Sequence, residues 1–145
     1  MIRILPASTN ADYAGSRWAA WFLVFLGVAW TGPGLIHSFL PDGGAGVIAG
    51  LDLTHSRALI VALFAWAGAT QIAHGLTMIA IGWRYRTLTP LLLAISLVER
   101  SLLAWSAWLR HAPASGHHPP EHYGSLVAVP LIGWFLWLSL RPTRQ

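Results

Sequence analysis

Four segments of the chain are apolar over lengths typical of membrane spans. They cover residues 18–40, 58–83, 90–109 and 124–140. A helix rises 1.5 Å per residue, so segments of this size reach across roughly 30 Å of hydrocarbon, with the last one the shortest. The pattern predicts an all-α fold, an integral membrane four-helix bundle, in which residues 1–145 form one domain.

Local signals indicate where these helices begin and where one is interrupted. Thr89 is a candidate N-cap with Pro90 at the first helical position, and Thr54 or Ser56 suits the start of the second span. Inside the first span, the Gly-Pro-Gly run at 32–34 breaks a good helical pattern. We expect a kink or a helix end there.

The second span carries a stripe of small residues around a polar one. Its members recur at spacings of three and four: Gly68, Gln71, Gly75, Met78 and Gly82. Residues at these spacings share a helix face, and small residues let two helices approach closely in a membrane. The stripe is predicted to face another helix, with His74 on a neighbouring face.

The third span contains two adjacent charged residues, Glu99 and Arg100. An unpaired charge near the middle of a bilayer costs at least about 2.5 kcal/mol. Ser96, Glu99 and Ser106 follow helical spacing, so this polar stripe is expected to face the protein interior. Arg100 lies about 100° further round the helix. We expect it not to neutralise Glu99 but to need a partner of its own or to snorkel toward the membrane surface.

Gln71, His74 and Glu99 fall at one depth when counted from the same membrane face. A contact among them is available if the second and third spans pack as an antiparallel hairpin, which the short link at 84–89 favours. Two interpretations stay open. In the first, the polar groups form a buried network that fixes helix register, with Arg100 bonding carbonyl groups freed at the Gly-Pro-Gly run.

The second interpretation is a functional site within the membrane. Burial would make Glu99 a proton donor or acceptor, with His74 as its relay or as a hydrogen-bond donor to a bound substrate, so these two are the candidate catalytic residues. The candidate ligand-binding residues are Gln71, Arg100, Ser96 and His37.

Composition agrees with a membrane protein and excludes some other classes. Of 145 residues, 55% are hydrophobic and 10% are charged, whereas soluble domains are about a quarter charged. The net charge of +4 comes from scattered arginines that form no patch for a run of phosphates, so no nucleic-acid partner is expected. The absence of cysteine excludes disulfides and thiolate metal ligands.

The placement of arginines predicts the orientation of the bundle. One side of the predicted membrane holds six arginines: Arg3, Arg17, Arg84, Arg86, Arg141 and Arg144. The other holds Arg57 and Arg110 against Asp42, Asp52 and Glu121. The positive-inside rule then places both termini in the cytoplasm of a bacterial inner (plasma) membrane, with a multi-pass topology. The first span lacks a small-x-small site at the right place, so we expect no signal-peptide cleavage.

Two loops on the opposite side contain histidine and carboxylate residues. Residues 37–57 are too glycine-rich to span and are expected to lie across the bundle mouth, where His37 would hydrogen-bond Asp42 or Asp52. Residues 117–122 read HHPPEH, and imidazole and carboxylate suit zinc or copper. No helical metal motif is present and two prolines indicate a loop, so we expect a solvated segment and no metal site.

Three features together resemble a group of small bacterial inner-membrane proteins of unknown function that are loosely DoxX-like. They are the LPDGGAGVIAGLDL stretch after the first span, the small-residue second span that runs to GWRYR, and the acidic-arginine pair in the third span. The resemblance covers most of the chain. It implies a compact four-helix bundle in the inner membrane and carries no catalytic residue or cofactor across.

Three hypotheses about function follow, in this order. The first, favoured narrowly, is an accessory or scaffold subunit that contacts a second copy or a partner membrane protein. The second is an intramembrane enzyme or binding protein for a lipid, a quinone or another apolar small molecule, with Glu99, His74 and Gln71 lining its pocket. The third is proton-coupled transport, which needs a water path past Glu99. In all three the chain contacts the lipid bilayer, and the residues name no cofactor.

Overall fold

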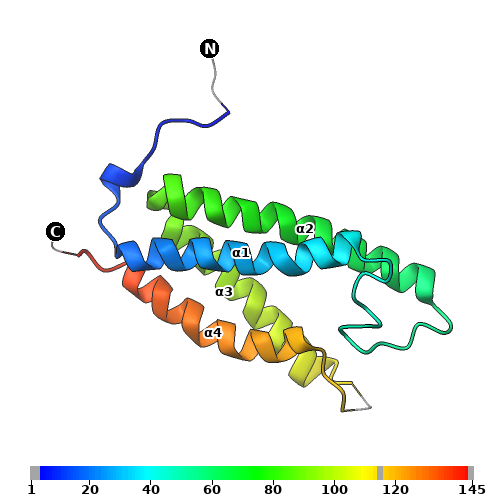
Figure 1. The fold of residues 1–145 in the computed structure, drawn as a ribbon. Coiled ribbons are helices and arrows are strands. Elements are labelled where there is room, and N and C mark those ends of the chain that lie inside the picture. Colours follow the sequence, from blue (N-terminus) through cyan, green and yellow to red (C-terminus); the bar gives the residue numbers. More distant parts are fainter. Residues whose placement is uncertain (1–3, 114–115, 144–145) are drawn as a thin grey trace.

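The computed structural model describes residues 4–113 and 116–143 and contains four long helices. These are α1 (Arg17–Phe39), α2 (Arg57–Arg84), α3 (Thr89–Trp105) and α4 (Pro120–Ser139), which run back and forth along the bundle (Figure 1). Three short turns accompany them: η1 (Asn10–Asp12), η2 (Arg86–Leu88) and η3 (Ser106–Arg110), the last with π-helical bonding. All four helices are long and apolar enough to cross a membrane, and the third stretch includes both flanking turns. The predicted all-α, four-span pattern is confirmed.

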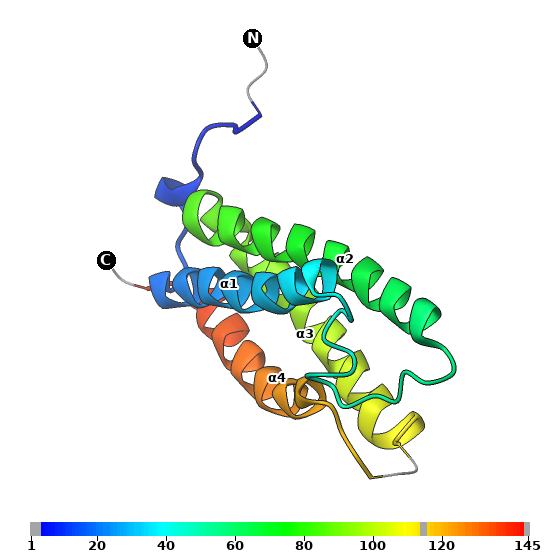
Figure 2. The ribbon, with the colours of Figure 1, turned by 45° about the vertical axis from the view of Figure 1, so that its right-hand side comes forward.

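The helices form two pairs. α1 packs along α2, and α3 packs along α4, while the two pairs cross at an angle (Figures 1 and 2). The expected hairpin of the second and third spans is therefore only partly correct, because α2 takes α1 as its main partner and meets α3 at few points. Both described ends of the chain lie at one end of the bundle (Figure 1).

Backbone contact at glycines holds α1 against α2. Three pairs of small residues meet, seven residues apart on each helix: Ala20 with Gly82, Gly27 with Gly75, and Gly34 with Gly68. A Cβ atom added to Gly75 would lie only 2.6 Å from the carbonyl oxygen of Gly27. The small-residue stripe thus faces another helix as predicted, and that helix is α1.

This contact also accounts for the Gly-Pro-Gly run. α1 continues through residues 32–34 without ending, so the expectation of a helix end is wrong. Gly34 packs on Gly68: a Cβ added to Gly34 would lie 3.0 Å from the carbonyl oxygen of Gly68. This packing extends along the last turns of α1. Tertiary contact therefore overrides the local helix-breaking signal of Pro33.

Two helix starts differ from the sequence expectation. Thr89 already has helical dihedral angles, because η2 leads directly into α3 and Leu88 precedes it. α4 begins at Pro120 instead of residue 124, after Pro119 in extended conformation. Proline is well suited to the first helical position. Glu121 consequently lies in the first turn of α4 and not in a loop.

A small apolar core joins the four helices in the half of the bundle nearer the chain ends. It includes Leu23 and Leu26 of α1, Met78 of α2, Leu93 of α3 and Ile132 of α4, all buried. Many other large apolar side chains are exposed, which is the arrangement expected when lipid covers the outer surface. The polar groups discussed below occupy the half of the bundle away from the chain ends.

The glycine contact predicts unequal effects for two Gly→Ala substitutions. Gly75→Ala should lower the free energy of unfolding by roughly 1–3 kcal/mol, because the new methyl group would press on backbone atoms of α1. Gly133→Ala is the matched control, since a Cβ at this position of α4 meets nothing within 4 Å. It should be neutral or slightly stabilising. Unfolding in mixed micelles measures both, and equal destabilisation by the two changes would contradict the contact.

Candidate functional site

Arg100 lies at the centre of a polar cluster between the helix pairs. The residue is 7% exposed. Its Nη1 donates a hydrogen bond to Oε1 of Glu121 at 3.1 Å, and its Nη2 donates to Oε1 of Glu99 at 2.9 Å. Its guanidinium carbon lies 3.9 Å from the centre of the Trp30 ring, within the range of a cation–π contact. One side chain thus joins α1, α3 and α4.

Two expectations for Arg100 are wrong. Arg100 does pair with Glu99. The two side chains leave the helix in different directions, but both are long and flexible enough to meet. Its other partner is the carboxylate of Glu121 and not a group of backbone carbonyls at residues 32–34. Sequence reasoning missed Glu121 because it assigned the residue to a loop. The proline pair before it was the available signal, because it favours a helix start.

His74 of α2 extends the cluster to the remaining helix. Its Nδ1 lies 3.5 Å from Oε2 of Glu99, so the predicted contact between the second and third spans is present. Ser96 does not join it, because its hydroxyl donates to the carbonyl of Leu92 in its own helix. Gln71 makes no hydrogen bond with Glu99, and its Oε1 is buried without a partner among the described residues.

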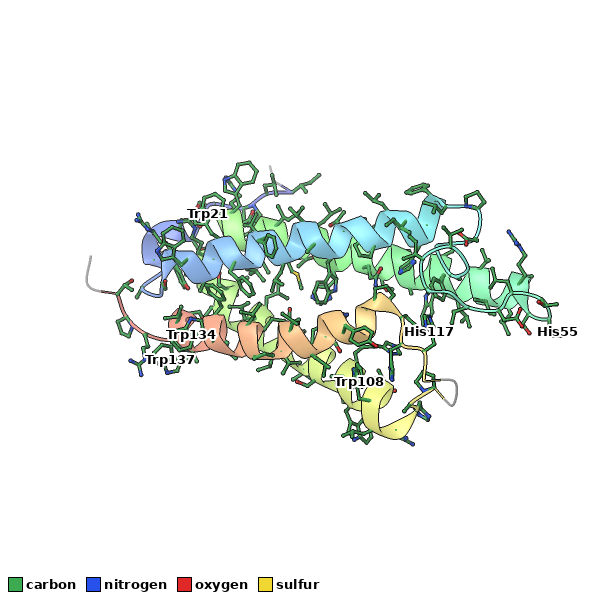
Figure 3. All side chains as sticks on the ribbon, turned by 60° about the horizontal axis from the view of Figure 1, so that its bottom comes forward. Trp21, His55, Trp108, His117, Trp134 and Trp137 are labelled. Carbon is green, nitrogen blue, oxygen red and sulfur yellow. The ribbon has the colours of Figure 1, made fainter. Side chains whose placement is uncertain are left out.

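A cavity of about 1000 Å³ opens beside Arg100. Most of its walls are apolar, and they come from α1, α2, α4 and the loops at this end: Ala29, Pro33, Ile36, Ile48, Phe64 and Ala128 are examples. His117, which lines it, lies toward the end of the bundle that carries His55 and away from Trp134 and Trp137 (Figure 3). The cavity is therefore in the half distal to the chain ends.

Only some of the predicted site residues line the cavity. Gln71, Arg100 and His37 line it, while Glu99, His74 and Ser96 do not. It adds polar residues that the sequence had not assigned to a ligand: Asp52, His117, Glu121 and His122, as well as the indole of Trp30. Glu99 and His74 are connected to the cavity through Arg100.

The loop after α1 forms a folded wall of the cavity. The carboxylate of Asp42 accepts backbone hydrogen bonds from Gly44 at 2.8 Å, Gly46 at 3.0 Å and Val47 at 2.9 Å. Gly44 has a φ of +76°, which suits glycine. The bonds from Val47 and Gly44, followed by that from Gly46, lower the pKa of Asp42. The backbone of this loop is thereby tied to one side chain.

Histidines join this loop to its neighbours. Nδ1 of His37 lies 2.6 Å from the carbonyl oxygen of Gly43, so the expected hydrogen bond with Asp42 or Asp52 is wrong: the Asp42 carboxylate is turned to backbone N–H groups. Nε2 of His117 lies 3.0 Å from the carbonyl oxygen of Ala49. These contacts link the loop to α1 and to the segment before α4.

The histidine-rich segment before α4 does not assemble a metal centre within the described ranges. No three His, Asp or Glu side chains there come together in a way that would hold an ion. His118 stacks on Trp108 with ring centres 4.0 Å apart, and its Nδ1 lies 3.0 Å from Nδ1 of His122. These rings pack on each other and on an indole.

Several buried polar atoms around Arg100 have no hydrogen-bond partner among the residues that the structure covers. They are Nε1 of Trp30, Oε1 of Gln71, Nε2 of His74, Oε2 of Glu99 and Nε of Arg100. Buried polar atoms in proteins are nearly always hydrogen-bonded to protein, water or a ligand. Three of these atoms belong to side chains that line the cavity, those of Trp30, Gln71 and Arg100, which marks this cluster as the candidate functional site.

No protein-family model, curated protein or solved structure matches this chain. The likeness to DoxX-like proteins therefore rests on sequence pattern alone.

The Arg100–Glu121 pair predicts strong energetic coupling between α3 and α4. Arg100→Met should lower the free energy of unfolding by about 3 kcal/mol, because two carboxylates lose a buried partner. Glu121→Met should cost less, since its side chain is partly exposed. A double-mutant cycle should give a coupling of about 1 kcal/mol or more.

Arg110 provides the control for this cycle. Its guanidinium lies over the Trp105 ring and forms no ion pair with a described residue. A cycle of Arg110→Met with Glu121→Met should give a coupling near zero. Coupling of the same size in both cycles would mean that the Arg100 contact is not specific.

The Asp42 contacts predict a pH-dependent loop. Because the folded-state pKa of Asp42 lies below its ordinary value of about 3.9, its contribution is present above that value and is lost as pH falls through the folded-state pKa. Amide exchange protection of Gly44, Gly46 and Val47 should decline in that acidic range. Asp42→Asn should lower the protection at neutral pH and remove its acid dependence.

Asp52→Asn is the matched control for the loop. The Asp52 carboxylate accepts hydrogen bonds from Thr54 and touches none of these three amides. This variant should therefore keep the acid dependence of their exchange. If it removed that dependence as Asp42→Asn does, the assignment to Asp42 would be wrong.

Proposed function

We propose that this chain is a membrane protein that binds an apolar small molecule in the cavity between its helices. The observation that carries the proposal is a cavity of about 1000 Å³ with mainly apolar walls and a few polar groups at Arg100. Ligand sites typically have volumes of 300–1,000 Å³ and the same mixture of apolar walls and sparse polar groups. A lipid, a quinone or another apolar molecule fits this description.

We rank this binding function above the scaffold role, whereas the sequence narrowly favoured the scaffold role. The scaffold hypothesis assigned the polar cluster to folding, and it assigned either the small-residue stripe or a tryptophan-rich surface to a partner. Within the chain, however, that stripe is already covered by α1. The cluster does join the helices, but it also borders open space, whereas a purely architectural network would be expected to lie in a packed interior. Binding therefore ranks first, with structural support as the second role of the same residues.

The positions of Glu99 and His74 favour binding over intramembrane catalysis. Neither residue lines the cavity, and a catalytic acid or base must come within hydrogen-bond reach of the reacting group. Glu99 holds Arg100 at 2.9 Å and His74 at 3.5 Å. We assign to both the role of positioning Arg100 beside the bound molecule.

The same proposal includes an orientation in a bacterial inner membrane. Arg17, Arg84, Arg86 and Arg141 belong to the end that carries the described termini; Arg3 and Arg144, which also entered the sequence argument, lie outside the described residues. By the positive-inside rule this end faces the cytoplasm. The cavity then lies in the outer half of the membrane.

The cavity can be blocked by one substitution that leaves the helix packing intact. A side chain at Gly124 of α4 would enter open space, since an added Cβ meets nothing within 4 Å, and Gly124 lines the cavity. Gly124→Trp should reduce the amount of a co-purifying apolar molecule at least tenfold. Native mass spectrometry of the protein from mild detergent measures this amount.

Gly133→Trp is the matched control, because Gly133 has equally open surroundings on the same helix but does not line the cavity. It should leave the bound molecule unchanged. Wild-type protein without a bound molecule that also fails to take one up from added lipid, or equal occupancy in the two variants, would contradict the proposal.

A further inference from the structure

The charge balance around the cavity restricts the headgroup of its ligand. Arg100 is the only arginine that lines the cavity within the described ranges, and it already contacts two carboxylates, those of Glu99 and Glu121. Asp52 also lines the cavity, so one arginine stands against three carboxylates. An anionic headgroup would meet a site with surplus negative charge, which is especially costly at low dielectric constant.

The unpartnered atoms restrict the headgroup further. Nε of Arg100 and Nε1 of Trp30 are buried and have no hydrogen-bond partner among the described residues, and both side chains line the cavity. Both nitrogens are donors only, so they need an acceptor. Leaving a buried donor unpaired costs about 1–3 kcal/mol.

A cationic group does not itself supply this acceptor, and an ester oxygen next to it would reach the two N–H groups only with the cation placed beside the Arg100 guanidinium. An ammonium group brings only donors, and a quaternary amine brings methyl groups, so either would leave the two N–H groups unpaired. It would also lie close to the Arg100 guanidinium. An uncharged oxygen supplies the acceptor without changing the charge balance, and Oε1 of Gln71, which is also unpartnered, can accept from a hydroxyl group.

We infer that the cavity selects an uncharged lipid-like molecule whose headgroup carries a carbonyl, ester or hydroxyl oxygen. This oxygen accepts from the side chains of Arg100 and Trp30. The hydrocarbon part contacts apolar walls such as Ile36, Phe64 and Ala128. The inference rests on the proposed binding function and adds the chemical class of the ligand.

A matched set of probes tests the headgroup. Monooleoylglycerol, oleoyl lysophosphatidic acid and oleoylcholine share an oleoyl ester and differ in headgroup charge, while octadecene lacks oxygen. Titration of the full chain in neutral detergent, followed by native mass spectrometry, gives the affinity for each probe. Monooleoylglycerol should bind at least tenfold more tightly than either charged probe and than octadecene.

Two Trp→Phe variants test the site of the oxygen. Trp30→Phe removes the indole N–H and keeps a ring beside Arg100, so it should weaken monooleoylglycerol binding roughly threefold to tenfold, as expected for one hydrogen bond. Octadecene binding should not change. Trp66→Phe is the control, because Trp66 on α2 is 71% exposed and does not line the cavity; it should leave all affinities unchanged.

The outcomes separate the inference from the proposed function. Equal affinity for all four probes, with binding still abolished by Gly124→Trp, would overturn the headgroup assignment and leave the binding function in place. Tighter binding of either charged probe would also overturn it. Binding of no probe, or binding that Gly124→Trp does not reduce, would overturn both. The comparison of probes uses the wild-type chain and so does not depend on the folding of any variant.

Discussion

The buried guanidinium of Arg100 is the constraint on which this bundle depends. A charge in an apolar bundle must be paired, and the pairing here draws a partner from almost every helix: the Trp30 ring of α1, Glu99 of α3 itself and Glu121 of α4. His74 connects α2 through Glu99. A large shift of a helix would expose a charge to hydrocarbon. Apolar surfaces alone would not specify the arrangement, because lipid and protein interiors are similarly apolar. The ion pairs therefore specify it.

The two helix pairs are built by different means, and the cavity lies where they separate. α1 and α2 meet at backbone distance through glycines along most of their length. The pair of α3 and α4 crosses the first pair. The two pairs share an apolar core in the half nearer the chain ends and are connected by the Arg100 cluster further along. Toward the distal end the pairs are bridged by loop residues, including the segment tied by Asp42 and the contact of His117 with Ala49. An open space of this size between tightly packed pairs is better explained by an occupant than by imperfect packing.

Under the proposed function, the residues that join the helices also contact the bound molecule. The carboxylates beside Arg100 offset its attraction for anions, which is why an uncharged ligand is proposed. The unpartnered donors of Trp30 and Arg100 belong to side chains that already lie on each other. A ligand oxygen would complete a network that the protein leaves incomplete, and incomplete buried networks are costly enough to favour such an occupant.

The sequence by itself determined the four helices, the small-residue face of α2 and the meeting of His74 with Glu99, because each depends on local length, helical spacing or depth. Only the tertiary structure decided that α2 takes α1 as its close partner, that Glu121 belongs to a helix and reaches Arg100, and that a cavity opens beside this pair. These features depend on the crossing of helices and on the reach of flexible side chains between segments far apart in the chain, which hydrophobic periodicity does not encode.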